Sequence, residues 1–342
     1  MKKKLRVAAL VREGLVPPEG LESYDVEKPP EWKMEFDIIA TLREMGHAVQ
    51  AVGLYDDLTP VRDCIVNWKP HVAFMMLEEF HGVAQYDHAI VSYLELMKQK
   101  YTGNNALGLM LTHDKALSKK ILNYHRIPTP GFTVFRRRHK VRLPAKLKYP
   151  LLVKSATEDA SLGISQSSIV HSDAALQERV RFIHESIETD ALVEEYIDGR
   201  EMYVGVMGNR QLTAFPVWEM FFRNMPEDVA RIATAQVKWN AEYQKKHGIE
   251  TGPASELSAD QLAGIQRMCK RVFRVLNMSG YARIDLRMNA AGQVYVIEAN
   301  ANPNLSYGED FAESAEVGGL PYEQLLSRIL SLGLSYRAPW QL

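Results

Sequence analysis

The chain has 342 residues, a length that fits two or three packed domains. Its residues are 46% hydrophobic and 24% charged, which is typical of a folded globular protein. Its 41 basic and 42 acidic residues leave a net charge of −1, so we expect neither nucleic acid nor a membrane as a partner. Cys64 and Cys269 lack a metal-binding spacing and indicate a reducing compartment. The apolar run VAALV at residues 7–11 is shorter than the about 7 residues of a signal peptide core or the about 20 of a spanning helix, so we expect a cytoplasmic protein.

Strand and helix patterns alternate through the first hundred residues. The apolar periodicity predicts, in order, a strand at 5–11, a helix at 36–47, a strand at 48–55, a helix at 58–70 and a strand at 71–77. Such alternation is typical of an open α/β sheet.

After residue 112 the pattern changes to a mixture of helices and β-hairpins. We expect helices at 113–127, 172–186, 257–278 and 321–332, and strands at 132–135, 149–156, 190–201, 281–288 and 294–300. The turn NAAGQ separates the last two strands, so they are predicted to pair as a hairpin.

Carboxylate and amide side chains gather on this predicted hairpin. Alternation puts Arg283, Asp285 and Arg287 on one face of the first strand, and Glu298 and Asn300 share a face of the second. If the strands pair, Asp285, Glu298 and Asn300 come together and offer the oxygen ligands that Mg²⁺ prefers. Alternatively, Asp285 pairs with one of the arginines and Glu298 lies at a solvated rim, and spacing alone does not decide between the two.

Two lysines lie beside flexible or polar segments. Lys154 ends the apolar strand LLVK and precedes the small-residue loop SATEDASLGIS, an arrangement that can hold phosphate, although a lysine reaching from a strand end to solvent is the alternative. Lys115 begins a helix, where a cation opposes the helix dipole, and local conflicts of this kind are more common at functional sites.

These pieces occur in the order of a known family. The stretches concerned are, in order, HDKALSKKIL followed by RIPTPGF, then YPLLVKSATEDASLGIS, ALVEEYIDGREMYVGV, FPVWE, VKW, YARIDLRM and VIEANANP followed by GGLPYEQLLSRIL. Through these stretches the sequence resembles the ATP-grasp carboxylate–amine ligases of the D-alanine–D-alanine ligase type. The resemblance covers about residues 110–330 and implies an α/β (α+β) ATP-grasp fold. It would comprise an open α/β domain at 1–112, a central lid subdomain at 113–195 and a C-terminal catalytic subdomain at 196–342, with the two subdomains clasping ATP.

The resemblance also implies a role for each matching residue. The phosphates of ATP would be held by Lys115, Lys154 and Lys238, and its ribose by Glu201. Adenine would be bound, largely through the backbone, by Glu194, Glu195, Tyr196 and Ile197, and the lid would be formed by Ser161, Leu162 and Gly163. Two Mg²⁺ ions (or Mn²⁺) would be bound by Asp285, Glu298 and Asn300. Arg283 would stabilise the acyl phosphate and the tetrahedral intermediate, and Lys238 and Ser161 would assist catalysis.

The implied reaction joins a small-molecule carboxylate to an amine, on amino acids or small peptides, and releases ADP and phosphate. A homodimer is the implied assembly. Three alternatives stay open: a genuine D-alanine–D-alanine ligase, a nucleotide-binding protein without turnover, and an enzyme that uses a thiol or hydroxyl acceptor or stops at the acyl phosphate. A dinucleotide-dependent dehydrogenase is disfavoured, because VREGLVPPEG lacks the glycine-rich turn after the first strand.

The regions that would bind substrate depart from the family. Asn304 replaces a glycine, and Glu309, with Asp310 beside it, stands where a serine would bind the carboxylate of the second alanine. The N-terminal substrate loop is also changed, so its candidate residues are Glu78, Glu79 and His81. Because an acceptor carboxylate would meet like charges, we predict an amine that lacks a nearby carboxylate or carries extra positive charge, and a product other than D-Ala-D-Ala. The alternative is that the acidic pair only caps the next helix.

Overall fold

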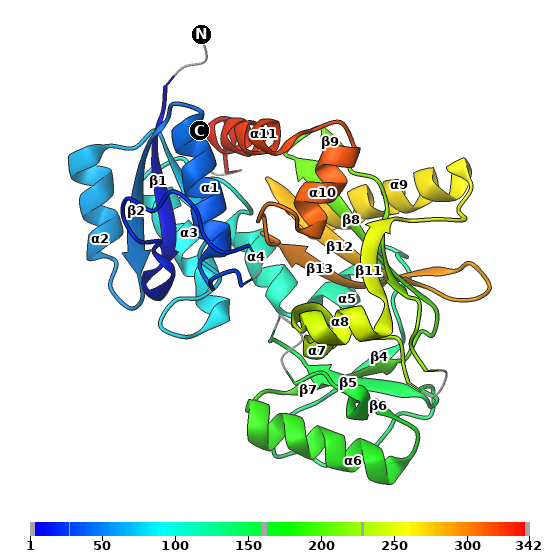
Figure 1. Cartoon of the computed structure of the whole chain (residues 1–342). Helices are drawn as coiled ribbons and strands as arrows, with labels where there is room; N and C mark the ends of the chain where they lie inside the picture. The colour runs from blue at the N-terminus through cyan, green and yellow to red at the C-terminus, as the bar shows by residue number, and fades with distance from the viewer. Residues whose placement is uncertain (1–3, 27, 159–162, 227–228, 339–342) are drawn as a thin grey trace.

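A parallel three-stranded sheet forms the N-terminal part of the molecule. The computed structural model describes residues 4–26, 28–158, 163–226 and 229–338 (Figure 1). In this sheet β1 (Arg6–Arg12) lies between β2 (Ala48–Leu54) and β3 (Val72–Met75), and residues 7–11 are all buried. A parallel strand that is buried on both faces reads as a continuous apolar run, which is why VAALV is a strand.

Helices cover both faces of this N-terminal sheet. One face packs on α1 (Lys33–Glu44) and on the last helix of the chain, α11 (Tyr322–Ser335). The other face packs on α2 (Thr59–Asp63), α3 (Asp87–Leu96) and α4 (Ala106–His113). The predicted open α/β sheet is confirmed, and α11 ties the C-terminal end of the chain into the N-terminal core (Figure 1).

The central part of the chain is an antiparallel sheet with one covering helix. Its strands are β4 (Phe132–Phe135), β5 (Leu151–Ser155), β6 (Ile169–Val170) and β7 (Ala191–Glu195), in the order β4-β7-β5-β6. Leu176 and Val180 of α6 (Asp173–Phe182) pack on it, and the Ser172 hydroxyl caps this helix by accepting the amide of Ala175 at 3.3 Å. The connecting helix α5 (Lys115–Tyr124) leads into this sheet from α4.

The C-terminal sheet is the largest and carries the predicted hairpin. Its strands are β8 (Arg200–Gly208), β9 (Leu212–Ala214), β10 (Trp218–Phe222), β11 (Ile249–Pro253), β12 (Tyr281–Met288) and β13 (Val294–Ala301). The order is β11-β10-β8-β12-β13, with β9 on β8, and β12 pairs antiparallel with β13 as predicted. The amphipathic α9 (Ala259–Val275) covers one face of the sheet, and its apolar side packs on β8, β12 and β13. The opposite face is therefore available to polar side chains.

Shorter helices complete this part of the chain. They are α7 (Ala235–Trp239), α8 (Ala241–His247) and α10 (Asp310–Val317). No helix in the described part of the chain is both long enough and apolar enough to cross a membrane.

The predicted helix at 113–127 begins two residues later than expected. Asp114 adopts an extended conformation and its carboxylate accepts the amide of Leu117 at 2.8 Å, so it caps α5 and separates it from α4. This cap places an anion next to Lys115 at the start of α5, where the helix dipole favours negative charge.

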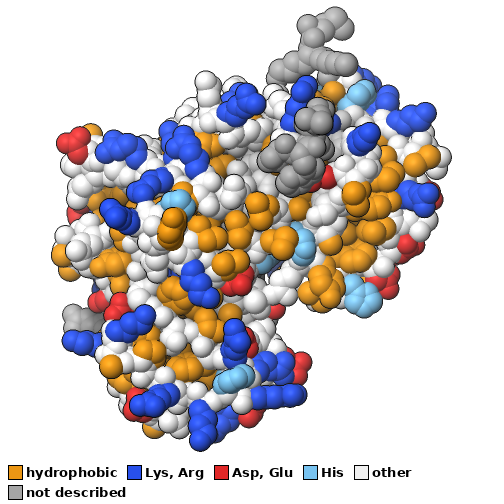
Figure 2. All heavy atoms as spheres, turned by 180° about the vertical axis from the view of Figure 1, so that it is seen from behind, with side chains coloured by type: hydrophobic (Ala, Val, Ile, Leu, Met, Phe, Trp, Pro, Cys, Tyr) orange, Lys and Arg blue, Asp and Glu red, His pale blue; other side chains and the backbone are white. Residues whose placement is uncertain are grey.

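The connection between two strands of the central sheet is rich in basic residues. Figure 2 shows Lys and Arg side chains around the lobe built by the central sheet. The connection between β4 and β5 contributes exposed basic residues at Arg136, Arg137, Arg138, Lys140, Arg142, Lys146 and Lys148. The near-neutral total charge of the chain therefore conceals a local basic segment that composition alone did not indicate.

A buried carboxylate in α1 makes the stability of the protein depend on pH. Glu35 is 2% exposed, and burial raises its pKa from 4.5 to about 7, with Glu78 adding to the effect and Arg12 opposing it. The folded state then holds a proton more tightly than the unfolded chain between pH 4.5 and 7, so stability falls as the pH rises through this window. Glu35→Gln is expected to stabilise the protein by about 2–3 kcal/mol at pH 8 and by little at pH 5.

Thermal melts at the two pH values test this expectation. The same change at the exposed Glu31 of the preceding loop is the matched control and should leave the melting temperature unchanged at both pH values. An equal shift at pH 5 and pH 8 for Glu35→Gln would show that the effect is not electrostatic.

Candidate active site

Four polar side chains share the open face of the β12–β13 hairpin. Asp285 lies directly opposite Glu298, and Arg283 lies directly opposite Asn300. Side chains in such cross-strand pairs stand about 4.5–5.5 Å apart at Cβ. The register therefore brings together the three residues that the sequence proposed as metal ligands, beside the proposed catalytic arginine.

Arg283 and Asp285 form a two-pronged ion pair. The Nε atom of Arg283 donates to Oδ1 of Asp285 at 2.7 Å, and its Nη2 donates to Oδ2 at 2.9 Å. Burial alone would lower the pKa of Arg283, but the Asp285 carboxylate outweighs this and raises it, so the arginine stays charged. The pairing that the sequence left as an alternative is thus present. The same carboxylate still faces Glu298 across the hairpin.

Glu298 faces two lysines from the other side of the site. Its Oε1 lies 3.6 Å from Nζ of Lys115 and its Oε2 lies 3.9 Å from Nζ of Lys154. The two lysine side chains are 4% exposed, so the alternative in which Lys154 reaches from the strand end to solvent is wrong. The Glu298 side chain is 21% exposed and lies against these lysines. Arg283, Lys115 and Lys154 thus converge on this part of the sheet, and each lies beside a carboxylate.

Behind Lys154, a buried carboxylate is held by two lysines. Glu194 on β7 is 1% exposed, with Oε1 2.9 Å from Nζ of Lys154 and Oε2 2.8 Å from Nζ of Lys119. Burial would raise the pKa of Glu194, but the two lysine charges prevail and lower it to about 2, so this carboxylate is ionised. The adenine role expected for Glu194 therefore does not rest on its side chain, which the lysines enclose.

Lys119 links the central sheet to β13. Its Nζ also donates to the carbonyl of Ile297 at 3.0 Å, at the point where a β-bulge interrupts the register between β12 and β13. Sequence reasoning missed this residue, although Lys119 follows Lys115 by four positions and so lies on the same helix face. A buried lysine that touches both sheets fixes the position of Glu298, the next residue along β13.

Breaking this network should destabilise the protein. Lys119→Met leaves Glu194 with one lysine in place of two, and we expect a loss of about 2–3 kcal/mol in the free energy of unfolding, somewhat below the cost of leaving a buried charge with no partner. Adding Glu194→Gln to the same chain should recover part of the loss, because the buried charge is then gone. Urea unfolding of the single and double variants measures this, and a double variant no more stable than Lys119→Met would contradict it.

Glu201, the expected ribose residue, is held by two neighbours. The hydroxyl of Tyr203 donates to its Oε1 at 2.9 Å, and Nη1 of Arg287 donates to its Oε2 at 3.1 Å. The expected adenine segment begins in β7 and continues past its end. The amides of Glu195 and Tyr196 donate to the carbonyls at 131 and 150, at 2.9 and 3.1 Å, and are used by the sheet.

Of the other residues expected to bind ATP, the structure describes Gly163 and Lys238. Gly163 has a left-handed φ of 71°, and its carbonyl accepts from Arg179. Ser161 and Leu162, the rest of the expected lid, lie outside the described residues. Lys238 is half-buried on α7, which the Thr234 hydroxyl caps by accepting the amide of Val237 at 3.3 Å.

The N-terminal substrate candidates separate in the structure. Glu78 borders a cavity of about 10 Å³ together with Asn302 and Pro303, which follow β13. Glu79 pairs with Arg12 at 3.4 Å. His81 stacks on Tyr55, with 5.9 Å between ring centroids, and its Nδ1 lies 3.9 Å from a carboxylate oxygen of Asp56. Glu78 is thus the one of the three that borders this cavity.

The two acidic residues before α10 also separate. Glu309 is the N-cap residue but makes no side-chain cap hydrogen bond, and its Oε1 lies 3.6 Å from Nζ of Lys33. Asp310 lies close enough to Arg283 to contribute to its raised pKa. The Oδ1 atom of Asn304 accepts the amide of Ser306 at 2.8 Å and shapes the turn between them. Of this group, Asp310 is the residue with a direct electrostatic link to the hairpin site.

The donor set of the hairpin fits Mg²⁺. This set contains two carboxylates and one amide, and within the part of the chain that the structure describes no group of three or more His, Cys, Asp or Glu side chains could hold a metal ion by itself. Two carboxylates and an amide, from Asp285, Glu298 and Asn300, suit an ion that takes one or two carboxylates and keeps positions for water and phosphate oxygens.

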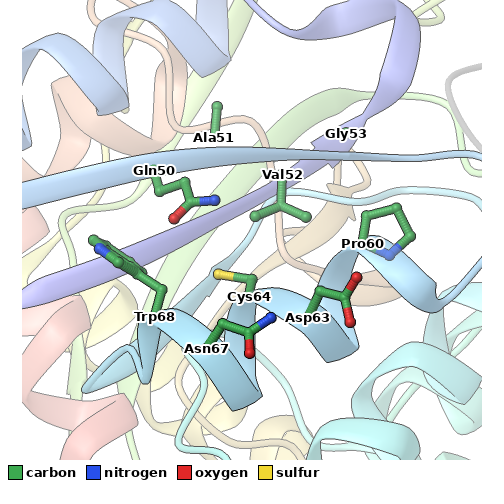
Figure 3. Close-up of a pocket in the computed structure, with 9 residues that line it drawn as sticks. All are labelled: Gln50, Ala51, Val52, Gly53, Pro60, Asp63, Cys64, Asn67 and Trp68. Atoms are coloured by element: carbon green, nitrogen blue, oxygen red, sulfur yellow. The ribbon is translucent and has the colours of Figure 1, made fainter.

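A larger pocket lies away from this site. It occupies about 410 Å³ between β2 and the helical segment of α2 and residues 64–68, where Val52, Cys64 and Trp68 line it (Figure 3). The predicted helix at 58–70 changes there to a π-helical turn (Cys64–Trp68), which the left-handed Lys69 ends as the C-cap residue. None of the residues proposed from the sequence lines this pocket.

Comparison with known proteins assigns the chain to a family. A family model described as the D-ala D-ala ligase C-terminus matches residues 121–331. The D-alanine–D-alanine ligase of Carboxydothermus hydrogenoformans is 30% identical over 75% of this chain and 80% of its own length. This chain belongs to the D-alanine–D-alanine ligase family. Enzymes of this family are ATP-grasp carbon–nitrogen ligases that use ATP and Mg²⁺, and the chain is an ATP-grasp ligase of this family.

Other relatives extend the likeness to the N-terminal part. An uncharacterized protein of Sinorhizobium fredii, y4sG, is 32% identical over 89% of this chain and 88% of its own length. The crystal structure of the D-alanine–D-alanine ligase of Bacillus anthracis superimposes with a TM-score of 0.75 at 21% identity, covering 96% of this chain and 97% of that one. The same enzyme complexed with ATP gives a TM-score of 0.73 at 22% identity. The ATP-grasp fold predicted for this family member is confirmed.

Proposed function

We propose that this ligase joins the carboxylate of one amino acid or small peptide to the amine of another molecule, through an acyl phosphate. The observation that carries the proposal is the shared face of the β12–β13 hairpin, where Arg283 stands beside Asp285, Glu298 and Asn300. A protein that only bound nucleotide would need phosphate-binding lysines but would have no use for an arginine at the acyl centre.

The chemistry explains why these residues are grouped. A carboxylate is a poor electrophile because its leaving group would be oxide, and phosphorylation by ATP gives it phosphate as a leaving group. Bound Mg²⁺ would neutralise charge on the transferring phosphoryl group, and its ligands would be Asp285, Glu298 and Asn300. Lys115 and Lys154 hold phosphate oxygens, and Arg283 stabilises the oxyanion that forms when the amine attacks.

The remaining roles belong to the same proposal. Glu201 binds ribose and Lys238 a phosphate. The segment from Glu194 to Ile197 binds adenine, and because the sheet uses the amides at 195 and 196, that of Ile197 is the candidate donor. The lid at 161–163 keeps water from the acyl phosphate. We also propose that the chain divides into domains at 1–112, 113–195 and 196–342. The protein would act as a homodimer in the cytoplasm, where ATP is supplied.

The acceptor amine is proposed to lack a carboxylate next to the amine or to carry extra positive charge. Lys33 partly neutralises Glu309, so Asp310, which acts on Arg283 electrostatically, carries this part of the argument. An acceptor carboxylate at that position would meet a like charge, at a cost of several kcal/mol as an order of magnitude. The product would then not be D-Ala-D-Ala.

Coupled ADP-release assays over a panel of acids and amines test this function. We expect turnover with amines that lack a carboxylate or are cationic, and little with D-alanine as sole substrate. In Asp310→Asn the preference should move toward carboxylate-bearing amines, while Glu309→Gln, the matched control, should change it little. Strong turnover with D-alanine alone would contradict the acceptor proposal, and ATP binding without turnover on any mixture would contradict ligase activity.

A further inference from the structure

Tyr203 occupies a central place on the catalytic face that its role in packing does not explain. On β8 it lies opposite Asp285 of β12, which in turn lies opposite Glu298 of β13, so the three side chains form one row across the sheet. The tyrosine is 3% exposed. A phenol at this position therefore stands among the charged groups of the site, not behind them.

The hydroxyl of Tyr203 fixes the proposed ribose carboxylate. It donates to Oε1 of Glu201 at 2.9 Å, while Arg287 holds the other oxygen at 3.1 Å. With one donor on each oxygen, the plane of the carboxylate is set from two sides. The remaining lone pairs of Glu201 are then oriented before nucleotide binds, which lowers the entropy lost on binding.

The ring of Tyr203 supports the proposed catalytic arginine. The guanidinium carbon of Arg283 lies 4.8 Å from the ring centroid, within the range of a cation–π contact. Asp285 holds the same guanidinium through two hydrogen bonds. Arg283 is thus restrained by a ring and by a carboxylate.

The far side of the ring packs in a small apolar cluster. Trp218, Met220 and Val237 belong to it, and Val237 precedes Lys238 on α7. Packing of this kind limits the movement of the ring. One side chain thereby contacts the ribose carboxylate, the arginine and the helix that carries a phosphate lysine.

We propose that Tyr203 is a positioning residue with two separable functions: its hydroxyl orients Glu201 for the ribose of ATP, and its ring orients Arg283 for acyl transfer. The inference rests on the proposed roles of Glu201 and Arg283. Tyr203 is proposed to act through these two residues.

Two substitutions separate the functions. Tyr203→Phe removes the hydroxyl and keeps the ring, so the Kd and KM for ATP should rise by about tenfold, the scale of a hydrogen bond to a charged group, while kcat stays close to that of the unchanged protein. Tyr203→Met removes both and keeps an apolar side chain, so kcat should fall as well, by about tenfold or more. Calorimetry with ATP gives the Kd and steady-state assays give kcat and KM.

Ile249→Leu is the matched control, because it changes the same cluster on β11, two strands away from Tyr203, with little change in volume. It should leave all three constants unchanged. The proposal is overturned if Tyr203→Phe binds ATP like the unchanged protein, if Tyr203→Met has the same kcat as Tyr203→Phe, or if Ile249→Leu loses as much as either. Should Tyr203→Met not fold, the Kd of Tyr203→Phe against its unchanged kcat still decides the hydroxyl function.

The calorimetric arm also separates this inference from the proposed function. If the unchanged protein binds ATP but turns over no acid and amine, the proposed ligase activity fails. The shift in Kd for Tyr203→Phe would still confirm or contradict the orientation of Glu201.

Discussion

Arg283→Met is expected to lower kcat for amide formation by about 10²- to 10³-fold, the cost of removing one donor to a developing oxyanion. The guanidinium lies opposite Asn300 and is held by Asp285 through two hydrogen bonds, so its position is set before substrate binds. The proposed adenine and phosphate contacts come from other elements, so ATP binding measured by calorimetry should change far less than kcat.

A second arginine, directly after β10 of the same sheet, provides the control for this experiment. Arg223 pairs with Glu250 at 3.0 Å, but both side chains are largely exposed, and such pairs contribute about 0–1 kcal/mol. Arg223→Met should therefore retain kcat. If Arg283→Met also retains it, Arg283 serves only as a structural partner of Asp285, and the assignment of the acyl centre is wrong.

Glu298→Gln is expected to reduce ADP formation by at least about 100-fold at low Mg²⁺, since loss of even an outer-shell partner of a metal costs 10- to 100-fold. The change removes one of two carboxylates from the proposed metal site and also one partner of Lys115 and Lys154. Raising the Mg²⁺ concentration should recover part of the rate, because the weakened site then fills by mass action.

The Mg²⁺ dependence distinguishes a ligand from an ion-pair partner. In Glu298→Gln the half-saturating Mg²⁺ concentration should rise, whereas Glu316→Gln, an exposed change on α10, should leave it unchanged. A reduced rate with unaltered Mg²⁺ dependence would mean that Glu298 acts only by holding the two lysines.

The hairpin site was predictable in part. Alternation puts Glu298 and Asn300 on one face of β13 and Asp285 with the arginines on one face of β12, but these faces coincide only because a β-bulge shifts the register between Asp285 and Leu286, and the sequence did not indicate that bulge. The sequence could not decide what Asp285 pairs with, because Arg283 and Arg287 lie equally close along the strand. In the structure Arg283 takes Asp285, and Arg287 reaches Glu201 on the neighbouring β8.

Contacts between distant segments were beyond sequence reasoning. Lys119, Glu194 and Ile297 meet because α5, β7 and β13 converge, and spacing along the chain carries no information about that convergence. Lys154 was read as a phosphate lysine or a solvent-reaching one, yet it is buried against Glu194. Such a buried pair depends on the packing of two sheets, which only the folded chain shows.

The N-terminal part shows the opposite balance between fold and site. Its strands and helices followed from apolar periodicity, and the parallel sheet is confirmed. Its candidate substrate residues were chosen from one loop, and the structure places only Glu78 at the cavity beside Asn302, while Glu79 and His81 pair with neighbours in the same part of the chain. The direction in which a loop side chain points depends on tertiary contacts.

The central claim is that this ligase activates a carboxylate as an acyl phosphate before an amine attacks. An acid found by the substrate panel, labelled with ¹⁸O in its carboxylate and turned over with ATP and the amine, tests it most directly. If the claim is right, one carboxylate oxygen leaves with the phosphoryl group, and ³¹P NMR of the released phosphate shows ¹⁸O in proportion to the amide formed. Unlabelled phosphate alongside amide formation would contradict it.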